Sequence, residues 1–380
     1  MNTTGTNRIK LLAMVTNFHI GGTERQVANL ALRIDPACFD LHLACLKNSG
    51  ELLRELEGLA VPRPEFRIGS LYALKTCWQA IRLSRYIRTH GIQIVHSYGF
   101  YPNVFAMTAA KLSGKAVAIA SIRDMGDGLT PLQTRMQRRV CRWADCVLVN
   151  AEAIRRRLIS QGYRPDNIVV IRNGITLSGS SAKRPGLLKR EFGLPDSAQV
   201  VVVFSRLNQM KGVQYFLDAA AIVARRFPGV RFLVAGDGAN KKELEQKAER
   251  MGLGPQTVFA GFRCDVRDWL PEADLSVLPS LSEGLSNSLL ESMASGVPVI
   301  GASVGGNPEV IDHEVTGLLV PPKDANALAN AMCRLLGDRE MAARFGRAGR
   351  RRVAEMFSVD RAVGETAGLY QRLVQAGAGI

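Results

Sequence analysis

Short, uniformly apolar runs alternate with amphipathic stretches along the whole chain, and this alternation restricts the fold more than any other feature. Strands that are apolar throughout are typical of a parallel sheet covered by helices on both faces. We expect strands in a first set at 9–15, 41–46, 92–96, 116–121, 146–150 and 168–171, and in a second set at 199–207, 231–238, 257–262, 274–280 and 297–302. The sequence therefore predicts an α/β protein with two doubly wound sheets.

A polar segment at 178–186, rich in Gly and Ser and containing Pro, separates the two sets of strands. The chain has 380 residues, which is enough for two domains. We expect one Rossmann-like domain over 1–175, a second over 176–360, and a terminal helix over 361–380 that packs on either of them. Ligands of doubly wound sheets bind beyond the carboxyl ends of the strands, so we expect the site in the cleft between the domains.

The net charge of +15 is unevenly distributed along the chain. Residues 1–180 hold 24 Lys and Arg against 12 Asp and Glu, a net of +12, whereas residues 181–380 hold 25 against 22, a net of +3. An excess of this kind indicates an anionic partner for the first half or simply solvated helix faces. Because no aromatic residues interleave with the arginines in a recognisable binding module, we expect no nucleic-acid partner.

Part of this charge lies in the segment 131–143. Leu132, Met136 and Val140 share it with four arginines (135, 138, 139 and 142). That pattern fits a helix lying on an anionic membrane surface, and it equally fits a helix packed on the core with a basic outer face. The segment is therefore our candidate for membrane contact.

The chain carries no sign of export or of a metal centre. Its first residues lack the long apolar run of a secretory leader, and no run reaches the roughly 18 residues of a membrane span. The seven cysteines form neither a CxxC pair nor a Cys/His metal pattern, so they indicate reduced thiols. We expect a cytoplasmic protein, peripheral on the inner face of the membrane if it contacts one.

Two glutamates, Glu283 and Glu291, stand eight positions apart in the stretch "EGLSNSLLE", directly after an apolar strand. Ser286 or Asn287 can cap the helix that begins between them and should end at Gly296. The amides at such a helix start favour a phosphate group. One carboxylate before a phosphate site and one after it suits a sugar nucleotide, with Glu291 accepting ribose hydroxyls and Glu283 facing the sugar.

Cations that could balance the phosphate follow the first strand of the second set. Arg206 and Lys211, in "SRLNQMKG", should lie at the same sheet edge as the glutamates, although ordinary solvated residues would give the same pattern. A guanidinium and an ammonium can together neutralise a diphosphate leaving group. The sequence contains no Asp-x-Asp motif, so we expect no cofactor and no divalent metal requirement.

These motifs together resemble the retaining glycosyltransferases of family 4, which have the GT-B fold of two Rossmann-like domains facing each other across a cleft. The stretch 283–291 resembles the family's Glu-x7-Glu motif, and 206–212 its Arg-x4-Lys-Gly segment. Other pieces occur in the expected order: "GGTERQVANLA" at 21–31, "IRNGI" at 171–175, "VAGDG" at 234–238, "FAGFRCDV" at 259–266 and "TGLLVPPKD" at 316–324. Each piece is weak alone, but the ordered set is specific and spans nearly the whole chain.

The resemblance implies roles for residues in both domains. The second domain would bind the nucleotide sugar, with Glu283 on the donor sugar, Glu291 on the ribose, and Arg206 and Lys211 on the diphosphate. The resemblance also implies a first domain that binds the acceptor. The other implied donor contacts are Gly284, the amides of Leu285, Ser286 and Asn287, the nucleobase segment Gly261, Phe262 and Arg263, and the phosphate loop Gly21 and Gly22.

Three residues of the first domain have weaker signals. His96 ends a predicted strand and matches a family position near the donor sugar, although a lone histidine there is usually structural. Where many members have a second histidine, this chain has Tyr98, which puts a role for a second histidine in doubt. Arg123 and Asp124 follow the next strand and could meet the acceptor or form a cap or surface pair.

The resulting hypothesis is a retaining glycosyltransferase of the hexosyltransferase type. It would move a sugar from a nucleotide-diphosphate sugar to a hydroxyl of a lipid-linked or envelope saccharide, as in polysaccharide biosynthesis. The alternatives are a nucleotide-sugar epimerase of the same fold and an inactive nucleotide-sugar-binding protein. A dehydrogenase is disfavoured because "GDG" at 236–238 does not continue as GxGxxG.

Overall fold

The computed structural model describes residues 8–71, 73–114, 116–177 and 186–377. It divides the chain into two compact units, one formed by 1–174 together with 359–380 and the other by 175–358. Most of the polar segment that we expected to separate the domains, 178–185, lies outside the described residues. Each unit is an α/β layered structure with its own sheet and its own core.

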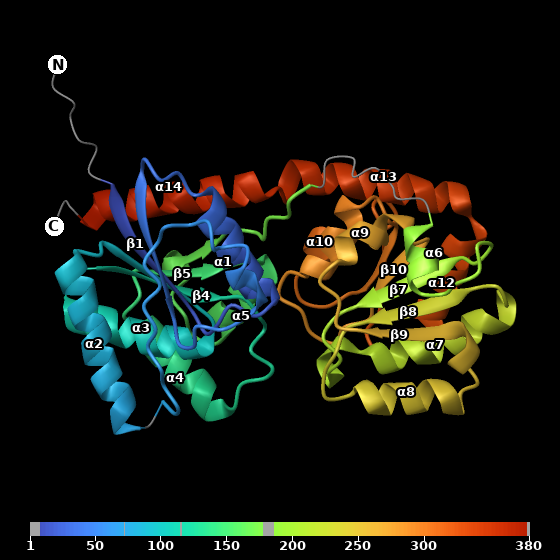
Figure 1. The fold of residues 1–380 in the computed structure, drawn as a ribbon, viewed down its shortest axis with the longest axis horizontal. Coiled ribbons are helices and arrows are strands. Elements are labelled where there is room, and N and C mark those ends of the chain that lie inside the picture. The colour runs from blue at the N-terminus through green and yellow to red at the C-terminus, as the bar shows by residue number, and fades with distance from the viewer. Residues whose placement is uncertain (1–7, 72, 115, 178–185, 378–380) are drawn as a thin grey trace, which may run out of the picture. The chain divides into compact units, whose positions relative to one another are not determined.

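The first unit contains a six-stranded parallel sheet with the strand order β2-β1-β3-β4-β5-β6. Because all of these strands are parallel, helices must return the chain across the faces of the sheet. In Figure 1, α1 and α14 lie on one side of this sheet and α3 and α4 on the other. The strands are β1 (Ile9–Val15), β2 (Phe39–Cys45), β3 (Ile94–Tyr98), β4 (Val117–Ile122), β5 (Cys146–Val149) and β6 (Ile168–Val170), and the helices are α1 (Gly22–Arg33), α2 (Leu74–His90), α3 (Phe100–Ser113), α4 (Pro131–Cys141), α5 (Glu152–Ser160) and α14 (Val359–Gly377).

The core of the first unit explains why its strands are apolar throughout. Leu11, Ala13 and Val15 of β1 are buried in one cluster with side chains of α1 and β2. The terminal helix α14 contributes Leu369 and Tyr370 to the same cluster. The apolar stripe of α14 is therefore buried in the first unit, although the chain reaches this helix after passing through the second.

The second unit repeats the design with the strand order β12-β11-β10-β7-β8-β9, again all parallel. Its larger core cluster is built from β7, β8 and the helices α7 and α12. The strands are β7 (Val200–Phe204), β8 (Arg231–Ala235), β9 (Thr257–Gly261), β10 (Leu275–Leu278), β11 (Val299–Ala302) and β12 (Leu318–Val320), and the helices are α6 (Leu187–Glu191), α7 (Val213–Arg226), α8 (Lys241–Arg250), α9 (Val266–Trp269), α10 (Asn287–Ala294), α11 (Asn307–Val310), α12 (Ala325–Gly337) and α13 (Arg339–Met356).

The strand orders fix where each unit can bind a ligand. In a doubly wound sheet the crevice lies where the order reverses, beyond the carboxyl ends of the two central strands. That point falls between β1 and β3 in the first unit and between β7 and β10 in the second. The loops that follow these four strands therefore border the expected ligand sites. Within the described ranges, no helix has the length and apolar character needed to cross a bilayer.

Candidate functional site

The loops after β7 and β10 come into contact at the switch point of the second unit. Gly212 ends the first loop with a φ of 66°, in the left-handed region. A Cβ atom on this residue would lie 2.1 Å from the carbonyl oxygen of Pro279. Leu281 N also donates to Met210 O at 2.8 Å. Glycine at 212 thus allows the close approach that brings Lys211 to the second loop.

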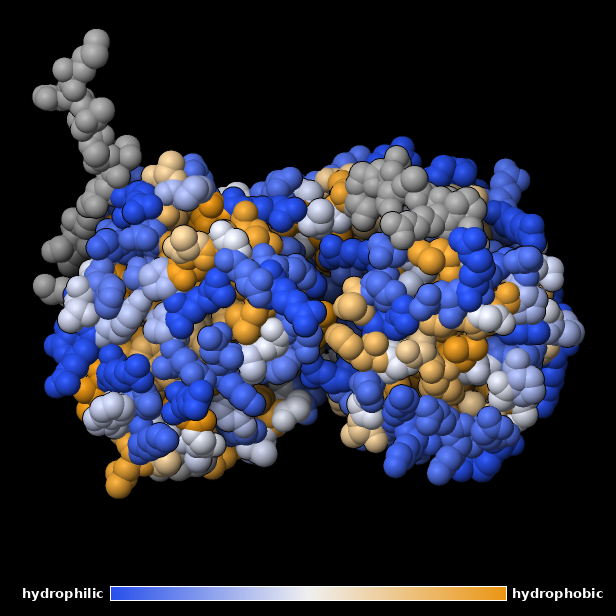
Figure 2. Space-filling view, viewed as in Figure 1, coloured by the Kyte–Doolittle hydropathy of each residue, from blue (hydrophilic) through white to orange (hydrophobic). Residues whose placement is uncertain are grey.

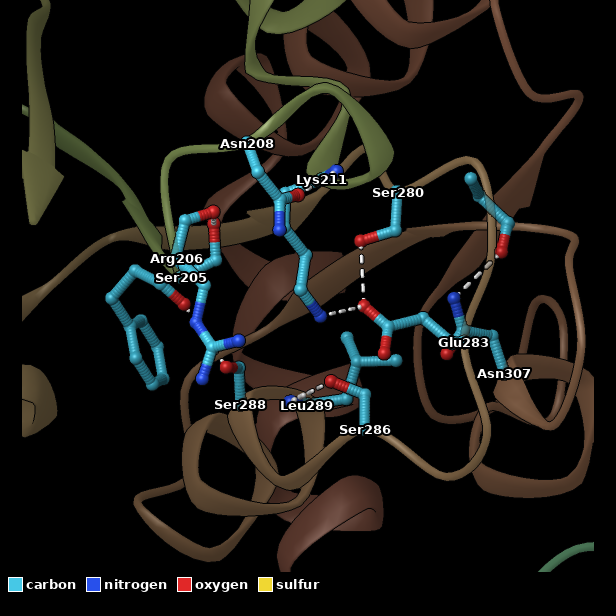
Figure 3. A network of polar contacts seen from close by, with 12 residues as sticks. Ser205, Arg206, Asn208, Lys211, Ser280, Glu283, Ser286, Ser288, Leu289 and Asn307 are labelled. Carbon is cyan, nitrogen blue, oxygen red and sulfur yellow. Dashed lines mark hydrogen bonds and ion pairs between the residues drawn. The ribbon is translucent and has the colours of Figure 1, made fainter. Parts of the chain in front are cut away.

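Lys211 and Glu283 form the central pair of this site (Figure 3). Lys211 Nζ lies 2.6 Å from Glu283 Oε1, and Ser280 Oγ donates to the same oxygen at 2.7 Å. The Glu283 side chain is 9% exposed and that of Lys211 25%. The structure therefore brings together two of the predicted site residues, from loops more than 70 residues apart, and holds the carboxylate in a fixed orientation.

Arg206 lies at the start of the same loop and is exposed. Its side chain and that of Lys211 both extend from this loop toward the first turn of α10 (Figure 3). Asn208 stabilises the turn between them, because its Oδ1 accepts the Lys211 amide at 3.2 Å. The two cations thus border the beginning of a helix, where an anion is favoured.

The helix α10 begins as predicted, with Ser286 as its N-cap. Ser286 Oγ accepts a hydrogen bond from Leu289 N, and Asn287 is the first helical residue. Leu285 is buried beneath this turn. Ser288 Oγ, one residue further, donates to Phe204 O at 3.0 Å and ties the helix to the end of β7. The amides of this first turn therefore lie beside the loop that carries Arg206.

A contact that sequence reasoning missed fixes the main chain at Glu283. Gly305, in the loop after β11, has a φ of 51°, and a Cβ atom there would lie 1.7 Å from the carbonyl oxygen of Glu283. Gly306 N donates to Gly284 O at 2.8 Å. The pair "GG" at 305–306 was the available signal, since consecutive glycines often mark a close backbone approach.

The second glutamate is held by an arginine that sequence reasoning also missed. Arg267 Nη2 lies 3.1 Å from Glu291 Oε1. Arg267 belongs to α9, which directly follows the predicted nucleobase segment, so this ion pair connects that segment to α10. Glu291 is half-buried, and the Arg267 guanidinium contacts one of its two carboxylate oxygens.

The nucleobase segment lies at the end of β9. Gly261 adopts a φ of 67°, and Phe262 is exposed. The Arg263 guanidinium bonds to Asp265 and to Glu191, the latter at 2.8 Å. These carboxylates raise the pKa of Arg263, and the guanidinium in turn holds the pKa of Asp265 below its usual value. The Arg263 side chain is thus held by two carboxylates, and the contact of this segment with a nucleobase stays a prediction.

In the first unit, Gly21 and Gly22 follow β1 at the switch point. Gly21 is the N-cap of α1, and Gly22 is its first residue. A Cβ atom on Gly21 would lie 2.4 Å from Glu24 Oε2, so a side chain there would displace this carboxylate. The glycine loop therefore lies where a ligand of this unit is expected, at the carboxyl edge of its sheet.

His96 is an interior residue in the structure. Its side chain has no exposed surface, and its Nδ1 lies 2.6 Å from the Tyr370 hydroxyl while Nε2 lies 2.7 Å from Ser121 Oγ. Tyr98 Oη also lies 3.0 Å from Nδ1. Burial lowers the pKa of His96 well below its usual value, which keeps the ring neutral. The position connects β3, β4 and α14, so a sugar reaches His96 only if these side chains move, and the expected sugar contact stays a prediction.

Arg123 and Asp124 also have local partners. Arg123 Nη2 donates to the Asn173 side chain, and Asn150 donates to the same oxygen at 3.1 Å. Asp124 is exposed, and its Oδ1 accepts the Gly126 amide at 2.8 Å. These contacts give both residues structural roles beside any contact with an acceptor. Within the described residues, no group of three or more His, Cys, Asp and Glu could hold a metal ion.

The fold and the site define a class of protein: two doubly wound domains, one with a cationic loop and a carboxylate at its switch point. Comparison with known proteins identifies the family. The family model described as "Glycosyltransferase Family 4" matches residues 20–178, and the one described as "Glycosyl transferases group 1" matches residues 198–338. The chain belongs to this family of glycosyltransferases and is a glycosyltransferase enzyme.

Characterised relatives have different substrates. The chain is 27% identical over 290 residues to an alpha-D-kanosaminyltransferase of Streptomyces kanamyceticus, covering 72% of this chain and 74% of the relative. It is 29% identical over 296 residues to a GDP-mannose-dependent alpha-(1-6)-phosphatidylinositol monomannoside mannosyltransferase of Mycobacterium tuberculosis, covering 74% and 76%.

Solved structures establish the fold. Anabaena HepE, crystallised with UDP and glucose, superposes with a TM-score of 0.85 at 22% identity, covering 96% of this chain and 100% of HepE. The predicted GT-B fold class is thus confirmed.

Proposed function

We propose that the enzyme transfers a sugar from a nucleotide-diphosphate sugar, with retention of anomeric configuration, to a hydroxyl of a lipid-linked or envelope saccharide. In this proposal the second unit binds the donor and the first unit the acceptor. Arg206 and Lys211 hold the diphosphate, Glu283 contacts the donor sugar, and Glu291 accepts ribose hydroxyls. The other donor contacts are those that the sequence predicts.

The observation that carries the proposal is the pair of Lys211 and Glu283 beside the first turn of α10. A diphosphate at this helix start would meet the Lys211 ammonium and the positive end of the helix. The carboxylate on the other side of Lys211 would then face the hydroxyls of the attached sugar. A site that places a cation between a phosphate position and an oriented carboxylate matches the diphosphate and the attached sugar of a nucleotide sugar.

The proposed reaction needs no protein nucleophile. Glu283 already contacts Lys211 and Ser280 through one oxygen, which suits a group that orients hydroxyls rather than one that attacks carbon. The bond from the anomeric carbon to the diphosphate oxygen breaks, the acceptor oxygen attacks from the same face, and the acceptor proton passes to the departing phosphate. Arg206, Lys211 and the helix amides stabilise the charge that develops on the leaving group, so we propose no metal requirement.

The acceptor class rests on charge and on relatives. The first half of the chain has a net charge of +12, which favours an acceptor with phosphate groups or one presented at an anionic membrane. The Mycobacterium tuberculosis relative is named for a phosphatidylinositol-linked acceptor. We propose that the enzyme works in the cytoplasm, at the inner face of the membrane.

A binding panel with purified protein tests the donor assignment. Thermal shifts are measured with UDP, GDP and ADP and their sugar conjugates, with and without EDTA. A ligand at about 100 times its Kd should add roughly 2.7 kcal/mol. A shift that is selective for one nucleotide and unaffected by EDTA supports a metal-independent transferase, whereas loss of the shift in EDTA contradicts it. Conversion of the sugar conjugate to its epimer without acceptor would support the epimerase instead.

A further inference from the structure

The outer face of α2 carries three exposed large apolar side chains, and two of them are the most exposed of the described first unit. Leu74 is 89% exposed, Trp78 61% and Ile81 46%. Their spacing of four and then three residues places them on one face of the helix. Side chains of this size rarely stay in water as a continuous row, so this face is typical of an interaction surface.

Cations border the same face, and the helix contains no acidic residue. Lys75, Arg82, Arg85 and Arg88 are all exposed. Arg82 lies over the ring of Phe66, with its Cζ 5.3 Å from the ring centroid. The other three have no ion-pair partner among the residues that the structure describes. The face therefore combines an apolar row with four positive charges.

The segment 131–143, where the sequence predicted membrane contact, has a different surface. In α4, Val140 is buried and Met136 is half-buried, so most of its apolar side faces the protein. Of its large apolar residues only Leu132 is more than half exposed, and Trp143 follows the helix at 40%. This segment is a basic helix face with little apolar surface to insert.

We propose that the outer face of α2 docks on an anionic lipid bilayer, with Leu74, Trp78 and Ile81 inserted at the interface and the cations on the lipid headgroups. Amphipathic helices with basic and bulky apolar residues bind such surfaces in this way. A second copy of the chain is disfavoured on this face. If two α2 faces packed together, the four cations of one would repel the four cations of the other. Figure 2 shows hydrophobic atoms among hydrophilic ones at the end of this unit where α2 begins. The proposal goes beyond the proposed function, because it rests on this surface and not on the reaction.

The three tryptophans of the chain allow a direct test. Trp269 is fully buried, so Trp78 and Trp143 are the exposed reporters of α2 and α4. The Trp143→Phe protein keeps the α2 reporter, and the matched Trp78→Phe protein keeps the α4 reporter. Each is mixed, without donor or acceptor, with phosphatidylcholine vesicles that contain or lack phosphatidylglycerol and that carry brominated acyl chains, which quench inserted tryptophan.

We expect quenching of Trp78 by the anionic vesicles and little by the neutral ones. A basic residue at an anionic surface contributes about 1 kcal/mol, roughly fivefold in affinity, so Arg85→Glu with Arg88→Glu should weaken binding by at least about 25-fold. Quenching of Trp143 alone would overturn the proposal in favour of α4, and quenching of neither would overturn it outright. Self-association that Trp78→Ser abolishes would also overturn it.

These outcomes are separable from the proposed function. If transfer to a soluble acceptor mimic persists while no vesicle quenches Trp78, the membrane surface is refuted and the enzyme assignment stands. If vesicles quench Trp78 but no nucleotide sugar is turned over, the membrane surface stands and the proposed reaction is refuted.

Discussion

Replacing Glu283 with glutamine should tighten the binding of a nucleoside diphosphate while slowing sugar transfer. The substitution keeps the shape of the side chain and removes its charge. In the structure this charge lies 2.6 Å from Lys211 Nζ and is almost fully buried. A phosphate that binds Lys211 is therefore repelled by the neighbouring Glu283 carboxylate. The Glu283→Gln variant removes this repulsion.

The magnitude follows from the geometry. A phosphate oxygen at hydrogen-bond distance on the far side of Lys211 Nζ would lie about 5 Å from the carboxylate. Two unit charges at that distance repel by about 3 kcal/mol at an effective dielectric constant near 20 and by about 1 kcal/mol in water. We expect the diphosphate to bind roughly 5- to 150-fold more tightly to Glu283→Gln. Turnover should fall by about 10²-fold, because the amide is a poorer acceptor for the sugar hydroxyls in the transition state.

Isothermal titration with UDP and GDP, together with initial rates of transfer, measures both effects. Ser280→Ala is the matched control, since it removes a hydrogen bond to the same carboxylate oxygen and keeps the charge. It should change nucleotide affinity by less than about threefold. Lys211→Met should weaken binding, because it removes the cation. Weaker binding to Glu283→Gln, or unchanged binding to both the Glu283 and Lys211 variants, would refute a phosphate beside this pair.

Two further predictions concern stability. Gly305→Ala should lower the free energy of unfolding by at least about 2 kcal/mol and reduce transfer, because the residue has positive φ and contacts the Glu283 main chain. Gly364→Ala is the control, since this glycine lies on the exposed side of α14 with open space around it. Urea denaturation should show that this second change is neutral or stabilising. Burial lowers the pKa of His96, so the unfolded chain binds a proton below about pH 6.5 that the native protein does not. The free energy of unfolding should therefore decrease as the pH is lowered below that value, by up to about 1.4 kcal/mol per pH unit. His96→Gln should remove this part of the pH dependence. If the unfolding free energy from urea denaturation has the same slope against pH near pH 7.5 and near pH 5.5, the buried neutral ring is contradicted.

The fold class could be predicted from the sequence because parallel strands covered on both faces are apolar along their whole length. Runs such as 9–15 and 199–207 therefore stood out from their polar surroundings. β12 (Leu318–Val320) was not among the predicted strands, since a run of three residues gives no periodic signal. The strand orders could not be predicted either. They depend on which crossover each helix makes, and hydrophobic periodicity does not report crossovers.

The candidate site could be located because strand ends converge at one sheet edge. This rule placed Arg206, Lys211 and Glu283 near one another, and the structure adds the contact between the last two. Their roles with a donor remain predictions. The rule says nothing about partners from distant segments, and so it missed the ion pair of Arg267 with Glu291 and the burial of His96 against Tyr370, which lies 274 positions away.

The same limit explains why the membrane-contact candidate shifts from 131–143 to α2. Both segments are basic helices with an apolar stripe, and periodicity shows which residues share a face but not which face a neighbour covers. α4 turns Val140 inward, whereas α2 buries a different side, with Leu83 and Ile87, and leaves Trp78 in water. Because α3 packs between these two helices, a substitution that loosens α4 would also disturb α2. The two reporters must therefore be compared in proteins that each retain native stability, which urea denaturation of each tryptophan-to-phenylalanine variant checks.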